Sequence, residues 1–224
     1  TSSVGRVFAS VKAITNFAIN ELGLEIRNPF SGVYIPPSDA QKRHSISLED
    51  IRAIQAECYQ QDDELRHIVV LISDTGMRLA EAFGLHQDDL ELDADVPHVH
   101  VCEHPWRPLK TTTSHRVIPL VGASLWAAQR IKQNGSDYAF PRYTDGIKCN
   151  SNSASAALNK WIKQVAGSGN VIHGFRHSFR DRLRAVSAPI DMIDQLGGWS
   201  LQSVGHGYGD GYSLDALHQT TMQI

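Results

Sequence analysis

The sequence predicts an α+β fold that is mainly α-helical and carries one small antiparallel β-sheet. Most of the chain repeats its apolar residues at three- and four-residue steps, as amphipathic helices do. Only two short stretches have the alternating or β-branched character of strands, HVHVCE at 98–103 and HRVIPL at 115–120. Because these two stretches are close in sequence, they favour a single antiparallel pair on a helical domain.

Length and composition place the chain among ordinary globular proteins. It has 224 residues, of which 42% are hydrophobic, so it can bury a substantial core. No apolar run reaches the roughly 18 residues of a membrane span, and the N-terminus has no secretory leader pattern, so a cytoplasmic protein is expected. Cys58, Cys102 and Cys149 are far apart and odd in number, which predicts reduced packing residues and no disulfide framework.

The N-terminal stretch predicts an amphipathic helix followed by a linker. Apolar residues recur from Val4 to Leu22 at helical steps, and Gly23 ends the pattern. Residues 27–44 contain Pro29, Pro36 and Pro37 without a sustained period, which is typical of a linker. The apolar stripe of this helix therefore needs a partner surface.

The remaining elements follow in order along the chain. Ser47 with Asp50 resembles a capping box that opens a helix through about residue 59. A second helix should run over 64–75 and end at Gly76, and a short one should follow at 78–85. Residues 109–111 are expected in a strand or turn between the two strands. Further helices are expected at 124–133, 153–165, 174–186, 190–196, 201–206 and 214–222.

Charge is unevenly distributed along the chain. The net charge of −3 argues, taken alone, against a nucleic-acid partner. The stretch 87–96 is strongly acidic, whereas 160–184 holds six cationic residues and the single acid Asp181. The sequence therefore allows a basic face and an acidic face on one molecule. The six cationic residues are Lys160, Lys163, Arg176, Arg180, Arg182 and Arg184.

The segment HGFRHSFRDRLR carries the first candidate site. His173 and Arg176 are three residues apart and share a face of the expected helix, while Phe175 and Phe179 belong to its apolar stripe. An imidazole beside a guanidinium suits an anion such as phosphate. Two other interpretations stay open: a surface helix that His173 caps, and a zinc helix using His173 and His177, which lacks the HExxH glutamate and further ligands.

Two other stretches carry candidate cations. In DTGMRLAEAFGL, Arg78 opens a helix and Glu81 is placed to hold its guanidinium. A cation at a helix start is electrostatically disfavoured, so a bound anion would explain it, although a surface ion pair is the alternative. In WRPLKTTTSHRVIPL, Lys110 lies near the turn of the predicted hairpin, where it is either functional or a solvated edge residue.

Taken in order, these blocks resemble the catalytic domain of the tyrosine recombinases, the phage-integrase family. They are TGMRLAE, the hairpin KT followed by RVIPL, HGFRH, LGGW and a tyrosine nine residues after Trp199. The resemblance covers 47–217, and the stretch 10–30 is similar to the closing helix of the family's core-binding domain and its linker. The implied domains are a remnant of that helix at 1–28, a linker at 29–46, and a catalytic domain with a C-terminal tail at 47–224.

The resemblance implies a chemistry as well as a fold. A tyrosine hydroxyl would attack a DNA phosphodiester and leave a 3′-phosphotyrosine and a free 5′-hydroxyl, with no metal or other cofactor. Arg78 and Arg176 would clamp the phosphate, and two fixed guanidiniums suit the charge on its equatorial oxygens. Lys110 would protonate the departing 5′-oxygen, and His173 would assist proton transfer or bind the phosphate.

Three further roles are implied near the ends of these blocks. Glu81 would support Arg78 or the region of the lysine. Trp199 takes a place more often filled by histidine; its indole can donate to a phosphate oxygen but cannot accept a proton, and core packing is its alternative role. The catalytic set implied by the resemblance is Arg78, Lys110, His173, Arg176, Trp199 and Tyr208.

The stretch GGWSLQSVGHGYGDGY holds two candidate nucleophiles. The interval from Trp199 selects Tyr208, and Tyr212 is expected to pack at the start of the C-terminal tail. Glycines around Tyr208 would let the backbone follow the phosphate during attack and release. His206 has no assigned role.

The resemblance also implies partners. They are double-stranded DNA attachment sites and three further copies of the chain, as a homotetramer on DNA that is a monomer when free. The tail SLDALHQTTMQI, with Leu214 and Leu217 as anchors, would pass to a neighbour or fold back on its own domain. DNA binding by this piece alone should be weak and strongly salt-dependent, because phosphate contacts would dominate it.

A bacterial or phage-encoded integrase is the leading interpretation of the function. The alternatives are a type IB topoisomerase and a degenerate integrase remnant that only binds DNA.

Overall fold

The computed structural model describes residues 2–36, 44–199 and 211–224 of the chain. It divides into two compact units, Thr1–Arg43 and His44–Ile224, and the boundary lies inside the predicted linker 29–46. None of the described helices combines the length and the apolar composition that a bilayer span requires.

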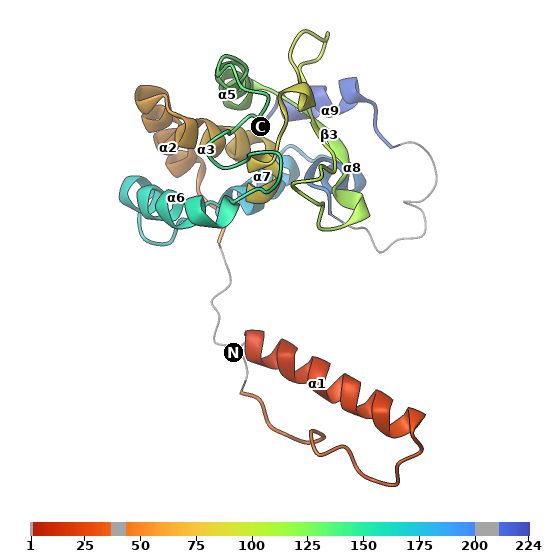
Figure 1. Cartoon of the computed structure of the whole chain (residues 1–224). Helices are drawn as coiled ribbons and strands as arrows, with labels where there is room; N and C mark the ends of the chain where they lie inside the picture. The colour runs from red at the N-terminus through yellow and green to blue at the C-terminus, as the bar shows by residue number, and fades with distance from the viewer. Residues whose placement is uncertain (1, 37–43, 200–210) are drawn as a thin grey trace. The chain divides into compact units, whose positions relative to one another are not determined.

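The first unit consists of helix α1 (Ser2–Glu21) and the segment that folds back along it (Figure 1). The side-chain amide of Asn28 donates to the Lys12 carbonyl at 3.0 Å and to Asn16 Oδ1 at 2.6 Å. Phe30 meets Phe8 edge to face at 5.7 Å between ring centroids. The predicted N-terminal helix is confirmed, and its apolar stripe is exposed.

The second unit is built around helix α3 (Glu64–Thr75), in which every residue from Ile68 to Thr75 is buried. It packs against α2 (Leu48–Gln61), α5 (Gly122–Lys132) and α7 (Gly174–Ala185), as Figure 1 shows. The caps are those expected: Ser47 Oγ accepts from the Asp50 amide at 3.0 Å, and Gly76 ends α3 at φ 60°. The other helices are α4 (Leu79–Phe83), α6 (Ser151–Ala166), α8 (Ile190–Gly197) and α9 (Leu214–Thr221). Of the expected helices, 201–206 lies outside the described residues.

A three-stranded antiparallel sheet covers one side of this unit. Strand β2 (His98–Val101) lies between β1 (Leu90–Glu91) and β3 (Arg116–Pro119), with Val99 paired to both Leu90 and Ile118. The two predicted strands are confirmed, but β1 was missed because two residues are too short to show a period. The segment between β2 and β3 forms a turn, with one 3₁₀ turn at Thr112–Ser114, so no strand forms at 109–111.

The cationic segment 160–184 does not form the free basic face that its composition allows. Arg176 is buried at 5% exposure. Three more of its arginines lie against carboxylates of the chain, which neutralise them. These pairs are Arg180 with Asp194 at 2.9 Å, Arg182 with Asp74 at 2.8 Å and Arg184 with Asp181 at 3.4 Å. Only Lys160 and Lys163 of the six are exposed without such a pair among the described residues.

Candidate active site

Three arginines from three different elements converge on the C-terminal end of helix α8. Each donates to one of three consecutive backbone carbonyls, 196–198. The C-terminal carbonyls of a helix have no partner within the helix and carry its partial negative charge, so guanidiniums there are stabilised. The bonds run from Arg116 Nε to Leu196 O at 2.9 Å, from Arg176 Nη2 to Gly197 O at 2.5 Å and from Arg78 Nη2 to Gly198 O at 3.4 Å.

The two glycines of LGGW make this approach feasible. Gly198 caps α8 in the left-handed region at φ 59°, where a Cβ would lie 2.8 Å from Arg116 Nη1. A Cβ on Gly197 would lie only 1.8 Å from the ring of Trp199. Any larger residue at either position would therefore displace an arginine or the indole.

Glu81 holds two of the three arginines. It is 3% exposed, and its carboxylate accepts from Arg78 Nη1 at 2.6 Å and from Arg116 Nη2 at 2.9 Å. Burial alone would raise the pKa of Glu81, but the Arg116 charge and the hydrogen bonds from both arginines lower that pKa to about 2. The alternative of a solvated surface pair at Arg78 and Glu81 is therefore wrong.

Arg176 is the most enclosed cation of the predicted set. Its Nη1 donates to Gly76 O at 2.6 Å, and its guanidinium lies 4.4 Å from the centroid of the Trp199 ring. Arg180 also lies against that ring, at 4.7 Å. Burial, then repulsion from Arg78 and Arg116, lowers the pKa of Arg176 to about 9. Trp199 thus packs, as its alternative role required, but it packs on cations.

The cluster carries more positive than negative charge. Three guanidiniums, those of Arg78, Arg116 and Arg176, face the single carboxylate of Glu81, which leaves a local excess of two charges (3 − 1 = 2). The side chain of Arg78 is 24% exposed and so can reach a bound molecule. Buried cations in excess raise the affinity of a site for an anion. The cluster is therefore suited to bind an anion such as a phosphate diester.

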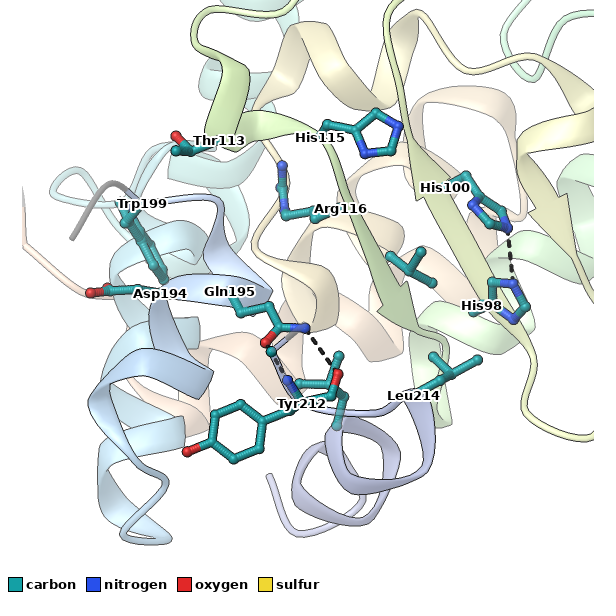
Figure 2. Close-up of a pocket in the computed structure, with 13 residues that line it drawn as sticks. His98, His100, Thr113, His115, Arg116, Asp194, Gln195, Trp199, Tyr212 and Leu214 are labelled. Atoms are coloured by element: carbon teal, nitrogen blue, oxygen red, sulfur yellow. Dashed lines mark hydrogen bonds between the residues drawn. The ribbon is translucent and has the colours of Figure 1, made fainter. Parts of the chain in front are cut away.

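A cavity of about 580 Å³ opens beside this cluster, between α8, β3 and α9. Figure 2 shows Trp199, Arg116 and His115 on its upper side, with Tyr212 and Leu214 below. Its lining includes both residues that flank the segment 200–210, namely Trp199 and Gly211. Tyr208 and His206 belong to that segment and lie outside the described residues.

His173 and Lys110 lie at the edges of the site. His173 precedes α7 and is exposed, so it does not share an exposed face with the buried Arg176, contrary to the expectation of a common polar face. Its side chain does not cap the helix, and its ring lies 5.3 Å from that of His177. Lys110 is exposed in the turn before residues 112–114, and its ammonium makes no hydrogen bond or ion pair within the described part of the chain.

Tyr212 has a structural role that agrees with the sequence prediction. Its backbone N–H donates to Gln195 Oε1 at 2.9 Å, and its carbonyl accepts from Gln195 Nε2 at 3.1 Å (Figure 2). Its hydroxyl donates to Asp191 Oδ1 at 3.0 Å, and this bond raises the pKa of Tyr212. A raised pKa makes the phenol harder to ionise, which disfavours Tyr212 as a nucleophile.

The C-terminal tail folds back on its own domain. Helix α9 packs on β3, where Leu217 is 2% exposed and Leu214 is partly buried. Of the two arrangements left open by the sequence, the single chain therefore adopts the one in cis, with both expected anchor residues facing the domain.

Arg116 and Gln195 were missed by the sequence prediction. RVIPL was interpreted only as an apolar strand, although strand alternation places Arg116 on the same buried face as Ile118. A charged residue on the inward face of a strand is the signal that could have identified it, because such a charge must be paired. No such signal in the sequence identifies Gln195, because its two hydrogen bonds reach Tyr212, which is 17 residues away along the chain.

Comparisons with known proteins agree with the fold. The family model described as Phage integrase family matches residues 45–210. The chain is 28% identical over 135 residues to tyrosine recombinase XerC of Neisseria meningitidis serogroup B (strain ATCC BAA-335 / MC58). That match covers 58% of this chain and 42% of the relative, so the chain spans less than half the length of this curated relative.

Solved structures share the fold at low identity. An integrase of the transposon Tn1549, in complex with transposon right end DNA, superposes with a TM-score of 0.67 at 18% identity, covering 99% of this chain and 78% of that chain. The integrase of mycobacterium phage Brujita gives 0.62 at 15% identity, with 96% and 69% covered. Since the family model matches most of the sequence, the chain belongs to the phage integrase family.

Proposed function

We propose that this chain is the catalytic part of a site-specific DNA recombinase that integrates or excises a mobile element. It breaks and rejoins DNA strands through a 3′-phosphotyrosine on Tyr208. The observation that carries the proposal is the set of three arginines on carbonyls 196–198, directly before the segment that contains this tyrosine. Fixed guanidiniums of this kind stabilise the charge that develops on a phosphoryl group.

Arg78 and Arg176 contact the phosphate in this proposal, and Arg116 holds them in place. Arg78 is the more accessible of the two, while Arg176 is fixed by two carbonyls and an indole face. Arg116 is buried beside Glu81, and its guanidinium donates to Leu196 O, to Ser114 O and to Glu81 Oε2. The clamp is thus assembled before DNA arrives, which avoids the cost of ordering it in the transition state.

The reaction balances with side chains of this chain alone. The Tyr208 hydroxyl attacks phosphorus, the bond from phosphorus to the 5′-oxygen breaks, and the ester moves to the tyrosine. Lys110 gives its proton to the departing 5′-oxygen, and His173 accepts the proton of the phenol. Trp199 donates only. Because the phosphotyrosine ester is retained, a second 5′-hydroxyl can reverse the steps without a nucleotide cofactor.

We propose double-stranded attachment sites as the partner, and four copies of the chain on two such sites. Two solved structures of this fold are an integrase in complex with transposon right end DNA and a site-specific recombinase bound to its difH substrate, which supports the assignment by analogy. The first unit, Thr1–Arg43, would be the end of a core-binding domain, and its exposed apolar stripe agrees with a missing neighbour. DNA is the substrate, so we place the protein in the cytoplasm of a bacterium.

A nicked suicide substrate tests the proposal directly. The nick lies beside the scissile phosphate, so cleavage releases a short oligonucleotide and traps the covalent adduct. Wild type should form a phosphotyrosine adduct at low salt, Tyr208→Phe should form none, and Tyr212→Phe should still form it. Adduct formation by Tyr208→Phe would overturn the assignment of the nucleophile, and no adduct with any attachment-site library would overturn the catalytic proposal.

Two further measurements separate recombination from its alternatives. Paired-site substrates should yield exchanged strands, whereas a type IB topoisomerase would relax supercoiled DNA without pairing sites. Light scattering on the free protein should give a monomer, and the complex with two sites should contain four chains. Relaxation without exchange would contradict the proposal of a recombinase.

A further inference from the structure

Three potential metal ligands from two segments converge at the base of the β2–β3 connection. Asp89 ends the 3₁₀ turn Gln87–Asp89, and Cys102 and His104 directly follow β2. Cys102 Sγ lies 3.2 Å from Asp89 Oδ1 and 3.5 Å from His104 Nε2, which itself lies 2.8 Å from Asp89 Oδ2. Among the described residues, this is the only group of three such side chains whose ligand atoms lie within 4.8 Å of one another.

The arrangement is more like a metal site than a proton relay. A Cys-His-Asp relay uses the two ring nitrogens of histidine separately, one for each partner. Here the same atom, Nε2 of His104, faces both the thiol and the carboxylate, although it can carry only one proton. An ion at a centre common to the three atoms would instead use Nε2, the thiolate and the carboxylate together as ligands.

Two of the three separations are close to those of a zinc site. Tetrahedral zinc bound to sulfur, nitrogen and oxygen places its ligand atoms about 3.3 to 3.5 Å apart, from bond lengths of about 2.3, 2.0 and 2.0 Å. Cys102 Sγ lies 3.5 Å from His104 Nε2 and 3.2 Å from Asp89 Oδ1, whereas Nε2 and Asp89 Oδ2 lie 2.8 Å apart, the length of a hydrogen bond. Binding of the ion would therefore have to separate the His104 ring from the Asp89 carboxylate by about 0.5 Å.

Neighbouring groups already hold the ligands in orientation. The backbone N–H of His86 donates to Asp89 Oδ2 at 2.8 Å. The His104 ring is stacked on Trp106, with 4.5 Å between centroids and 5° between planes, and the indole N–H of Trp106 donates to Gly84 O at 3.0 Å. Such supporting contacts fix ligand geometry in metal sites.

Metal binding at this cluster should depend on pH. Zinc binds the thiolate form of cysteine, so the thiol proton of Cys102 must leave when the ion binds. The affinity for the ion should therefore rise with pH.

We propose that Asp89, Cys102 and His104 bind a zinc ion with water as the fourth ligand. The ion ties the end of β2 to the turn before β1, and so stiffens the base of the segment that carries Lys110. Borderline ligands of sulfur, nitrogen and oxygen select zinc over the hard cations Mg²⁺ and Ca²⁺. The sequence predicted no metal, and this site departs from that expectation because Asp89 lies 13 residues before Cys102, without a recognised ligand spacing.

Cobalt substitution tests the site in a way that activity assays cannot. The full chain, without an affinity tag and freed of metal by a chelator, is titrated with Co²⁺. One equivalent should give tetrahedral ligand-field bands in the visible and a thiolate-to-cobalt charge-transfer band in the near ultraviolet. One equivalent of Zn²⁺ should displace the cobalt and remove the ligand-field and charge-transfer bands. Binding of either metal should release protons, and the affinity should fall as the pH falls.

Two variants and two matched controls test whether the cobalt spectrum arises from Cys102 and His104. Cys102→Ser should abolish the charge-transfer band, and His104→Gln should weaken cobalt binding at least tenfold. The first control, Cys149→Ser, removes the other half-buried thiol. The second, His100→Gln, breaks the pair of histidines whose Nε2 atoms, on His98 and His100, lie 3.0 Å apart. Both controls should bind cobalt as wild type does.

The change in Tm on addition of Zn²⁺ tests the site even if a variant is less stable than wild type. Zn²⁺ should raise the Tm of wild type and of both controls, and should leave the Tm of Cys102→Ser unchanged, whatever its starting value. Absence of a charge-transfer band in wild type, or its survival in Cys102→Ser, would overturn the proposal and leave the cluster as a hydrogen-bonded tie.

Discussion

The arginine cluster and the turn that carries Lys110 place their cations in opposite environments, one buried and hydrogen-bonded and the other exposed. Arg176 and Arg116 are both 5% exposed, and each is fixed by several hydrogen bonds. Lys110 is exposed and makes no bond to any described residue. The difference agrees with the two roles that we propose, because a charge clamp must be rigid before the reaction, whereas a proton donor must reach its acceptor.

The cluster also shows how buried like charges are tolerated. Arg78, Arg116 and Arg176 repel one another, and the pKa values of Arg116 and Arg176 are lowered by burial and by this repulsion. One carboxylate and three helix-end carbonyls offset part of that cost. Stability and anion binding are therefore linked here, since a bound phosphate would relieve the remaining repulsion.

Removal of the exposed cation, Lys110, should have the largest effect on the rate of cleavage and almost none on stability. We expect Lys110→Ala to slow cleavage of the nicked substrate about 10²- to 10⁴-fold, the usual range for a general acid. The unfolding free energy should stay within about 0.5 kcal/mol, because no contact is lost. A substrate with sulfur in place of the 5′-bridging oxygen should restore the rate, since a thiolate leaves without a proton.

Lys160→Ala is the matched control for this variant, because Lys160 is also exposed but lies on α6. If the sulfur substrate is cleaved as slowly as the normal one by Lys110→Ala, the lysine is not the proton donor.

Removal of a fixed cation should change both rate and stability. We expect Arg176→Lys, which keeps the charge but loses the planar fork, to slow cleavage by about 10² to 10³. Two bonds to carbonyls and a stacked indole are also weakened, so the Tm should fall. Single-turnover adduct formation and thermal unfolding measure the two effects. Arg184→Lys on the same helix, in an exposed pair, should change neither; equal loss in both variants would contradict a special role for Arg176.

Acid should weaken the cluster through Glu81. Because its pKa in the folded protein is about 2, below the ordinary 4.5, its contribution is complete above about pH 4.5 and is lost as pH falls toward 2. The loss should be on the order of 3 kcal/mol. Denaturant unfolding across this pH range measures it, and the stability difference between wild type and Glu81→Gln should shrink on acidification. A constant difference would show that the carboxylate titrates normally.

Removal of the Gln195 side chain, which holds the backbone of Tyr212, should have the smallest effect. Gln195→Ala removes two hydrogen bonds to Tyr212, which should cost about 1 to 3 kcal/mol of stability. The adduct rate should fall less than for Arg176→Lys, because the clamp itself is intact. Gln133→Ala removes a glutamine outside this region as a control, and a rate loss as large as that of Arg176→Lys would mean that Gln195 acts on the phosphate directly.

Local patterns in the sequence predicted most of the elements and part of the site. Ser47 and Gly76 mark helix ends that the structure reproduces, because capping depends on a few neighbouring residues. The pair of Arg78 and Glu81 was predicted for the same reason, being three residues apart on one turn. β1 could not be predicted, since a two-residue strand is defined only by its partner.

By itself, the sequence determined the order of helices, the two main strands and the family to which the chain belongs. The tertiary structure alone decided that Arg116 joins the arginine cluster, that the arginines of α7 are mostly neutralised, and that Asp89 meets Cys102 and His104. The physical reason is the distance along the sequence between the residues that interact. Periodicity and caps act between neighbours, whereas Arg116 meets a carbonyl 80 residues away, and no pattern within one segment encodes that contact.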